Sequence, residues 1–341
     1  MKSHARLAQV ALCLAAAVAT VASAAPASDY YKGKQIRMII GHPVGNDYDL
    51  GGRFLAKYLT RHLPGNPAII VSNMPAASSV AAANFFYNQA PRDGTVFGSF
   101  SRNIPSQALM RQANLEVDPR RYSWIGGTAL PARVCAAWHT AKVRTPADLL
   151  TTELIVGGGG SGTSLSILPT VFNHVLGTKF RVVEGYKGAN DTIIAMERGE
   201  VEGVCASHGQ FRTHERAIKD GKLRFIFRAE ESPIPTLPGL SSIYELAKSE
   251  DQRQLMRFVF SSTEFGRPYV MPPETPKEIV ALMRRSFADA VKDPELVAEA
   301  QRLKLDMTYR PPEVLEKLVA NLYQTPQSII DAVRRLVPNI K

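Results

Sequence analysis

The sequence predicts an α/β protein built as two lobes. Short apolar runs typical of buried strands are each followed by a polar loop rich in Gly or Ser, and then by apolar residues at helical spacing. This order occurs twice along the chain, although no sequence repeat accompanies it. The 341 residues also exceed the roughly 100–200 expected of one domain. In such folds the loops after parallel strands gather at one sheet edge, where ligands bind.

Residues 1–24 are expected to be a secretory signal peptide. Lys2 and Arg6 precede an apolar run of Ala, Leu and Val, and Ala22, Ser23 and Ala24 provide a small-residue cleavage site. The alternative is a membrane anchor, but the run is short for a span of about 20 residues. The cysteine in this segment follows a leucine that is too large for a lipid-attachment site. We therefore expect a freely soluble exported protein.

The charge of the chain is basic but dispersed. Lys2 and Arg6 leave with the signal peptide, so the mature chain keeps +8 of the formal net charge of +10. The basic residues are scattered, and no basic run is interleaved with aromatic residues. We therefore expect no nucleic-acid partner. An exported protein with a positive field is better suited to collecting anionic solutes.

Two cysteines remain in the mature chain. Cys135 and Cys205 lie in apolar runs that resemble strands, and an exported protein meets an oxidising compartment. A disulfide and two buried thiols both fit this pattern, because the sequence does not set the Cα separation that a disulfide requires. Both alternatives stay open at this point.

The first strand and helix organise the N-terminal lobe. Residues 36–40 form an Ile-rich strand, and Asp49 is the predicted N-cap of a helix that ends at Pro64 and Gly65. The loop at residues 41–48 then joins a strand end to a helix start. Free backbone N–H groups and the positive end of the helix dipole favour an anion there.

Two further strands of this lobe also end in polar loops. Strands are predicted at residues 68–71 and 96–100, followed by loops at residues 73–79 and 101–103. A helix is expected at residues 80–89, and a turn at 91–94 precedes the third strand. Three Gly-, Ser- or Asn-rich loops should therefore meet at one edge of the sheet.

The middle of the chain repeats this plan and the last part is helical. The remaining predicted strands are at residues 122–125, 134–138, 154–156, 180–183, 201–206, 223–227, 258–260 and 269–271. Predicted helices begin at Thr145-Pro146, after the loop at 157–164, at Asp191, and at Pro276, Pro294 and Pro311. Gly126 and Gly127 are interpreted as a crossover between the lobes.

The Gly-rich loop at residues 157–162 provides the strongest competing hypothesis. It satisfies G-x-G-x-x-G between a predicted strand and helix, and Glu184 follows at the distance of the dinucleotide fingerprint. The export signal argues against a dinucleotide enzyme. Thr163 breaks both the phosphate-loop pattern and the G-x-S-x-G pattern of a nucleophilic serine. An exported hydrolase using Ser161 with His208 and Asp191 remains the weaker alternative.

Several histidines and Asp47 could contact a solute or a metal, but structural roles explain the histidines equally well. His42 follows the first strand, but a packed or solvated histidine is the more common case. The histidines at 174, 208 and 214 have no metal-ligand spacing with the cysteines, so no metal site is expected. The carboxylate of Asp47 should repel an anionic ligand unless it contacts an amine or a hydroxyl group of that ligand.

The order and spacing of these motifs resemble one family. The chain is similar to the extracytoplasmic solute-binding proteins of tripartite tricarboxylate transporters, the Bug (TctC-like) family. The resemblance covers nearly the whole mature chain and is carried by residues 36–49, 73–75, 91–95, 157–164, 186–188, 221–224, 273–276 and 293–295.

The resemblance implies a two-lobed Venus-flytrap of the type II periplasmic binding-protein fold. Lobe one would comprise residues 25–130 and 256–341, and lobe two residues 131–255. The implied function is that of a periplasmic protein, not an enzyme and without a cofactor, that closes on a small organic carboxylate. It would deliver this ligand as a monomer to the large and small membrane components of a permease. Hinge motion is expected near residues 126–133 and 249–258.

The same resemblance implies the ligand-binding residues by position. They are Val44, Gly45, Asn46, Asp47, Ala77, Ser78, Ser79, Ser99, Ser101, Ser161, Gly162, Thr163, Ser164, Tyr186, Ala189, Asn190 and Ser207.

Three departures from the family pattern bear on the ligand. Glycines usual in the first two loops are replaced, and a histidine usual after the Gly-rich loop is Ser166. Asn46 is expected to tolerate positive φ, whereas Ala77 and Ser78 are not. The carboxylate is therefore expected to differ from a plain dicarboxylate, and Asp47 favours an amine or hydroxyl on it. A periplasmic sensor partner of a membrane kinase is a third hypothesis with the same ligand step.

Overall fold

The computed structural model describes residues 30–129, 132–159, 163–231, 233–234 and 236–336. The predicted signal peptide therefore lies outside the described residues. Within the described ranges, no helix combines the length and the hydropathy needed to cross a membrane.

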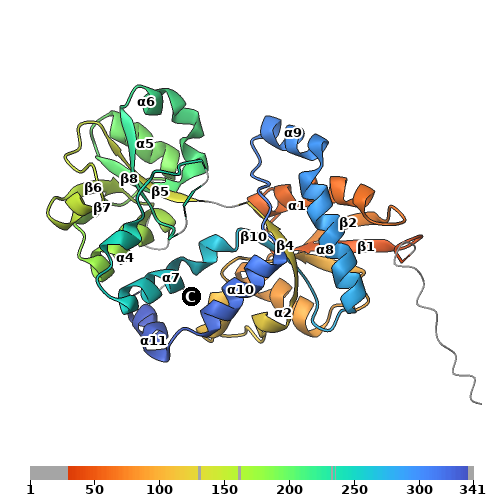
Figure 1. Cartoon of the computed structure of the whole chain (residues 1–341). Helices are drawn as coiled ribbons and strands as arrows, with labels where there is room; N and C mark the ends of the chain where they lie inside the picture. The colour runs from red at the N-terminus through yellow and green to blue at the C-terminus, as the bar shows by residue number, and fades with distance from the viewer. Residues whose placement is uncertain (1–29, 130–131, 160–162, 232, 235, 337–341) are drawn as a thin grey trace, which may run out of the picture.

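The first of two five-stranded sheets holds the N-terminal strands and one late strand. Its order is β2 (Ala68–Asn73), β1 (Gln35–Ile40), β3 (Val96–Ser99), β10 (Arg267–Met271) and β4 (Ser123–Thr128). The strands β2, β1 and β3 are parallel, and β10 runs antiparallel to both β3 and β4. Figure 1 shows this sheet on the right, separate from the green strands of the second sheet.

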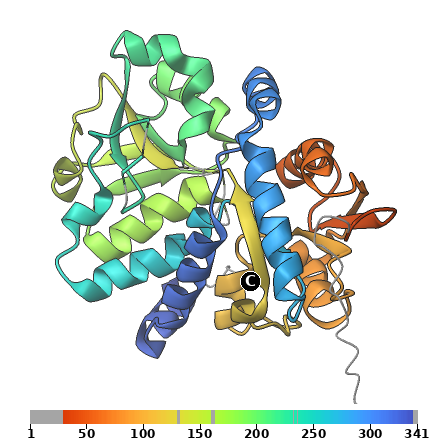
Figure 2. The ribbon, with the colours of Figure 1, turned by 45° about the vertical axis from the view of Figure 1, so that its right-hand side comes forward.

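Alternating side chains of the first sheet build a core on each face. Met38 and Ile40 of β1 pack with α1 (Asp47–His62), α8 (Lys277–Lys292) and α9 (Pro294–Leu303), whereas Ile39 faces the opposite cluster. That second cluster is covered by α2 (Val80–Asn88), α3 (Ile104–Leu109) and α10 (Pro312–Tyr323). Figure 2 shows α8 lying alongside β4.

The second sheet has the same layered plan. Its order is β7 (Phe180–Val183), β6 (Leu154–Gly157), β8 (Gly203–Ser207), β5 (Arg133–Trp138) and β9 (Leu223–Arg228). One face is covered by α4 (Ser164–Leu176) and α7 (Glu250–Glu264), and the other by α5 (Ala189–Glu197) and α6 (Glu215–Lys219). The expected two-lobed α/β architecture is therefore present. The residue limits of the lobes stay a prediction.

Cys135 and Cys205 form a disulfide, which resolves the alternative left open by the sequence. They are directly opposite each other on the antiparallel strands β5 and β8, with their Cα atoms 4.0 Å apart. Both residues are fully buried in the core beneath α4 and α7. The bond thus crosslinks the interior of the second sheet.

Three expectations about elements are wrong. Residues 258–260 are not a strand but part of α7, which Ser249 caps by accepting a hydrogen bond from Gln252 N at 3.2 Å. Phe258 packs toward α11 (Gln327–Leu336) and Phe260 packs toward the second sheet, as the two sides of one helix require. The helix expected at 145–146 is a short 3-10 turn, Ala147–Leu150, and Gly126 and Gly127 lie inside β4.

The two connections between the sheets touch each other. Ala129 follows β4 with a φ of 66°, and Gly266 precedes β10 with a φ of 61°. A Cβ atom added to Gly266 would overlap the carbonyl oxygen of Ala129. Arg310 also joins this region, because it exchanges two backbone hydrogen bonds of 2.9 Å with Gly127. The two connections and the segment around Arg310 therefore form one compact junction, and hinge motion at this junction stays a prediction.

Candidate functional site

The first loop is fixed by the start of α1. Asn46 is the N-cap residue, and its Oδ1 accepts a hydrogen bond from Tyr48 N at 2.8 Å. The prediction of Asp49 as N-cap is therefore wrong: Asp49 lies at the third position of the helix. Asn46 has an extended backbone, with φ −68° and ψ 157°. The residue of this loop in the left-handed region is Gly45, with a φ of 80°.

Asp49 instead ties three segments together. Its Oδ2 accepts from Gly45 N at 2.9 Å, and its Oδ1 accepts from Asn73 Nδ2 at 2.8 Å and Arg53 Nε at 2.9 Å. Burial alone would raise the pKa of this carboxyl, but the three hydrogen-bond donors outweigh burial and hold the pKa below its ordinary value. Asp49 is therefore an ionised structural group that holds the first loop against the end of β2.

Asp47 has a cationic partner within its own lobe. Arg267 of β10, only 4% exposed, donates from Nη1 to the carbonyl oxygen of Asp47 at 2.8 Å. The same nitrogen lies 3.6 Å from the Asp47 carboxylate, whose side chain is 67% exposed. The negative charge beside the first loop is thus compensated, which weakens its repulsion of an anionic ligand.

Tyr48 connects the first loop with the third loop and the hinge. Its ring stacks on His42 with the centroids 3.9 Å apart. Its hydroxyl accepts from Arg102 N at 3.2 Å and donates to Gly266 O at 3.4 Å. Burial lowers the pKa of His42, so the imidazole is neutral near pH 7. Tyr48 therefore links the first loop to the connection before β10.

The second loop contains three consecutive left-handed residues. Ala77, Ser78 and Ser79 have φ values of 50°, 54° and 80°, and they lead directly into α2. The expectation that Ala77 and Ser78 avoid positive φ is wrong. Ser79 is buried and donates from Oγ to Gly41 O at 2.6 Å, whereas Ala77 and Ser78 are exposed. The anchor on the first loop offsets part of the backbone strain.

The third loop completes the edge of the first sheet. Ser99 accepts a hydrogen bond from Gly41 N at 2.7 Å through its carbonyl, while its buried Oγ has no partner among the described residues. Ser101 Oγ accepts from Asn103 N at 3.3 Å. The predicted residues of this lobe therefore do come together at one edge, with Val44 at their rim, 73% exposed.

In the second lobe, two predicted residues, Ser161 and Gly162, lie outside the described residues. Thr163 precedes α4, its Oγ1 is 3.3 Å from Ser166 Oγ, and Ser164 is the first residue of the helix. Ser166 donates to Glu184 Oε2 at 2.8 Å. The acidic residue of the dinucleotide fingerprint is thus engaged with the helix that follows the Gly-rich loop.

Four more predicted residues follow β7 and β8. Tyr186 donates from its backbone N to Gly158 O at 3.1 Å, and its ring packs on the core beside α5. Ala189 is buried at the start of α5, and Asn190 beside it is exposed. Ser207 ends β8, and its backbone N donates a hydrogen bond to Gln210 Oε1 at 3.3 Å. Because β7, β6 and β8 are neighbours, the loops after them lie along one sheet edge.

Sequence reasoning missed several residues that build this site. The pair of Asp49 and Arg53 has the i,i+4 spacing of a helical ion pair and was detectable. Arg267 and Tyr48 act through contacts more than 200 residues apart in sequence, and no local pattern signals them. Among the described residues, no group of three His, Cys, Asp or Glu side chains is arranged to hold a metal ion.

Comparison with known proteins finds one similar curated sequence and several similar solved structures. No protein-family model matches the sequence. The chain is 23% identical, over 93% of its length and 94% of the relative, to the UPF0065 protein in gbd 5'region of Cupriavidus necator. Its structure resembles that of a TctC solute binding protein from Polaromonas without ligand, with a TM-score of 0.67 and 18% identity over 90% of this chain and 98% of the other.

Two similar structures contain carboxylates. MatC from Rhodopseudomonas palustris, with bound malate, has a TM-score of 0.53 and 17% identity over 87% of this chain and 98% of its own. An R. palustris protein with adipate has a TM-score of 0.54 and 17% identity over 89% and 97%. The chain thus resembles the TctC and Bug solute-binding proteins and shares their two-lobed fold.

Proposed function

We propose that this protein is a periplasmic solute-binding protein that holds a small organic carboxylate between its lobes. It delivers the ligand to the large and small membrane components of a tripartite tricarboxylate transporter. The likeness to structures with malate and adipate supports the ligand class. No catalytic step is part of this function.

The observation that carries the proposal is the paired arrangement of loops. Each sheet has three loops after three neighbouring parallel strands, and α1, α2, α4 and α5 begin from these loops. Helix N-termini and backbone N–H groups bind carboxylate without a cationic side chain. In the first lobe, the hydrogen bonds of Asp49 with Gly45 and of Ser79 with Gly41 hold the first loop in one geometry, which lowers the entropic cost of binding.

The proposed contacts remain those inferred from the sequence. The first lobe contributes Val44, Gly45, Asn46, Asp47, Ala77, Ser78, Ser79, Ser99 and Ser101, and the second contributes Ser161, Gly162, Thr163, Ser164, Tyr186, Ala189, Asn190 and Ser207. The proposed lobe limits are residues 25–130 with 256–341, and 131–255. The distribution of strands between the two sheets supports them.

The test is ligand binding by residues 25–341. A thermal-shift screen with C4–C6 dicarboxylates, citrate, amino acids and aromatic acids is followed by calorimetric titration of each hit. A ligand at 100 times its Kd adds about 2.7 kcal/mol of stability, a shift of several degrees. Ser78→Ala and Asn190→Ala, one exposed residue from each lobe, should weaken binding about 5- to 10-fold if each loses one hydrogen bond.

The control is Ser328→Ala on α11, an exposed serine outside the proposed contacts. It should bind like the wild type. Hydrolysis of test esters, or a nucleotide retained on purification, combined with no response to any acid, would support the enzyme alternative and contradict transport. If the protein binds a carboxylate but does not deliver it to any permease, the sensor hypothesis is favoured.

A further inference from the structure

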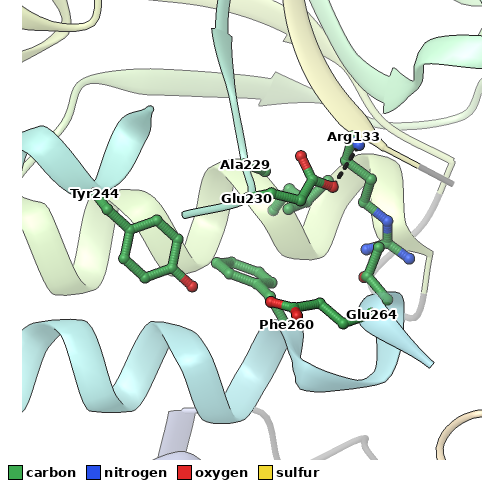
Figure 3. Close-up of a pocket in the computed structure, with 8 residues that line it drawn as sticks. Arg133, Ala229, Glu230, Tyr244, Phe260 and Glu264 are labelled. Atoms are coloured by element: carbon green, nitrogen blue, oxygen red, sulfur yellow. Dashed lines mark hydrogen bonds between the residues drawn. The ribbon is translucent and has the colours of Figure 1, made fainter. Parts of the chain in front are cut away.

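A small cavity lies where the connections between the lobes meet. It has a volume of about 10 Å³, the size of one water molecule. Figure 3 shows Glu230 above it, Glu264 below, Arg133 on the right and Tyr244 on the left. Arg133 is the first residue of β5, and Glu264 is the last residue of α7. Both carboxyl groups therefore lie at the hinge rather than at the loops of the proposed ligand site.

Glu230 binds the connection between β4 and β5 through hydrogen bonds. Its Oε1 accepts a hydrogen bond from Arg133 N at 2.6 Å, and its backbone carbonyl accepts from Ser242 Oγ at 2.8 Å. The second carboxylate oxygen, Oε2, is buried and has no hydrogen-bond partner among the described residues. An ionised carboxylate with one unsatisfied oxygen in such a site is costly, and a protonated carboxyl is much less so.

Glu264 faces the second connection and the third segment. Its carbonyl accepts from Arg310 Nη2 at 2.9 Å, and its Oε2 lies 4.0 Å from that guanidinium. Arg310 is in turn bonded through its backbone to Gly127 of β4. The two carboxyls and two arginines thus join both connections to the sheet of lobe one.

The surrounding charges do not neutralise Glu230. Arg133 attracts its carboxylate but makes no ion pair within 4.0 Å of it in the described structure, and Glu264 repels it. The groups facing Glu264 are Arg310, Glu231 and Arg257, and those facing Arg133 include Arg102. Burial is the largest effect: it raises the pKa of Glu230 to about 7, and it raises the pKa of Glu264, whose side chain is still 39% exposed, above its ordinary value.

We propose that Glu230 and Glu264 form a proton-dependent latch that sets the relative orientation of the lobes. When Glu230 is protonated, the arrangement of the junction described here is favoured. When Glu230 ionises, arrangements that hydrate its carboxylate or bring it onto the guanidinium of Arg133 are favoured instead.

Proton linkage gives the direction of the pH dependence. A carboxyl whose pKa is raised by burial binds more protons in this arrangement than in one where it meets water. The arrangement described here is therefore most populated at low pH and loses population as the pH rises toward about 7. Between pH 5 and 8.5 the equilibrium changes by up to about 100-fold if the carboxyl becomes fully hydrated in the other arrangement.

The experiment measures lobe separation in the mature protein without ligand, by energy transfer between one dye on each lobe, from pH 5 to 8.5. The wild type should change its transfer efficiency as the pH rises from 5 to about 7 and should change little above that pH. Glu230→Gln, which mimics the protonated carboxyl, should keep the low-pH value throughout. Glu278→Gln, an exposed glutamate in the first turn of α8, is the matched control and should titrate like the wild type.

A second readout does not depend on the dyes. In urea denaturation, Glu230→Gln should gain stability over the wild type at pH 8 and lose that gain at pH 5. Glu264→Gln tests the other half of the latch and should reduce the amplitude of the lobe titration. A flat wild-type profile, or an unchanged profile in Glu230→Gln, would overturn the latch. Because no ligand is present, either result leaves the proposed binding function untouched.

Discussion

At the scale of single residues, two kinds of interaction shape the proposed ligand site. Asp49 uses both carboxylate oxygens to hold the first loop, α1 and the end of β2 in one geometry. Ala77 and Ser78 do the opposite, because their left-handed backbone stores strain in the second loop. The strain persists because Ser79 is anchored to Gly41 by a buried hydrogen bond.

The strain in the second loop predicts that glycine at position 77 stabilises the protein. A left-handed conformation costs an L-residue about 1–2 kcal/mol, and glycine avoids this cost. Glycine also increases the conformational entropy of the unfolded chain, which cancels part of the gain in stability. Ala77→Gly should therefore raise the free energy of unfolding by about 0.5–1 kcal/mol in urea denaturation. Ala76→Gly, in the adjacent position without positive φ, should lower it. Equal effects of the two substitutions would contradict the strain.

Secondary structure was predictable wherever local pattern and tertiary packing agree. The Ile-rich run of β1 and the apolar spacing of α1 each have one dominant period, and both elements are present. The run at 258–260 was misassigned because Phe-Val-Phe is a short apolar run that fits a buried strand as well as a helix. The whole 15-residue helix α7 is amphipathic, and that pattern is visible only over its full length. Packing against both α11 and the second sheet decided the outcome.

The disulfide makes a prediction for the second sheet. Cys135 and Cys205 are 70 residues apart in sequence, so their bond removes many conformations of the unfolded chain. Replacing both by alanine should cost about 2–4 kcal/mol in the free energy of unfolding. A reductant should destabilise the wild type by a similar amount and leave the double variant unchanged. A wild type insensitive to reductant after full reduction would refute this contribution.

Across the whole molecule, the geometry between lobes was the least predictable part. The three loops of the first lobe follow from strand ends that the sequence shows, and they do converge. The contacts of Arg267 with Asp47, and of Tyr48 with Gly266, join positions far apart in the chain. The junction chemistry of Glu230 and its neighbours has no local signature, because it depends on how three segments meet.

The hinge makes a prediction about Gly266. Its left-handed backbone and its close approach to Ala129 leave no room for a side chain. Gly266→Ala should cost at least about 1–2 kcal/mol of stability and change the lobe separation measured by small-angle scattering. Gly239→Ala has open space and no positive φ, so it is the matched control and should cost less. Equal stability of both variants would show that the connections are not tightly packed.

The position of β10 determines the order in which the lobes can be completed as the chain emerges during its synthesis or transport. This strand lies between β3 and β4, yet its residues follow all five strands of the second sheet in the chain. As the polypeptide emerges with its N-terminus first, β4 has no neighbour in its sheet until residues 267–271 are available. The second sheet, including its disulfide, can assemble before then. The first lobe is therefore completed last, and a chain truncated before residue 267 leaves β3 and β4 as exposed edges that favour aggregation.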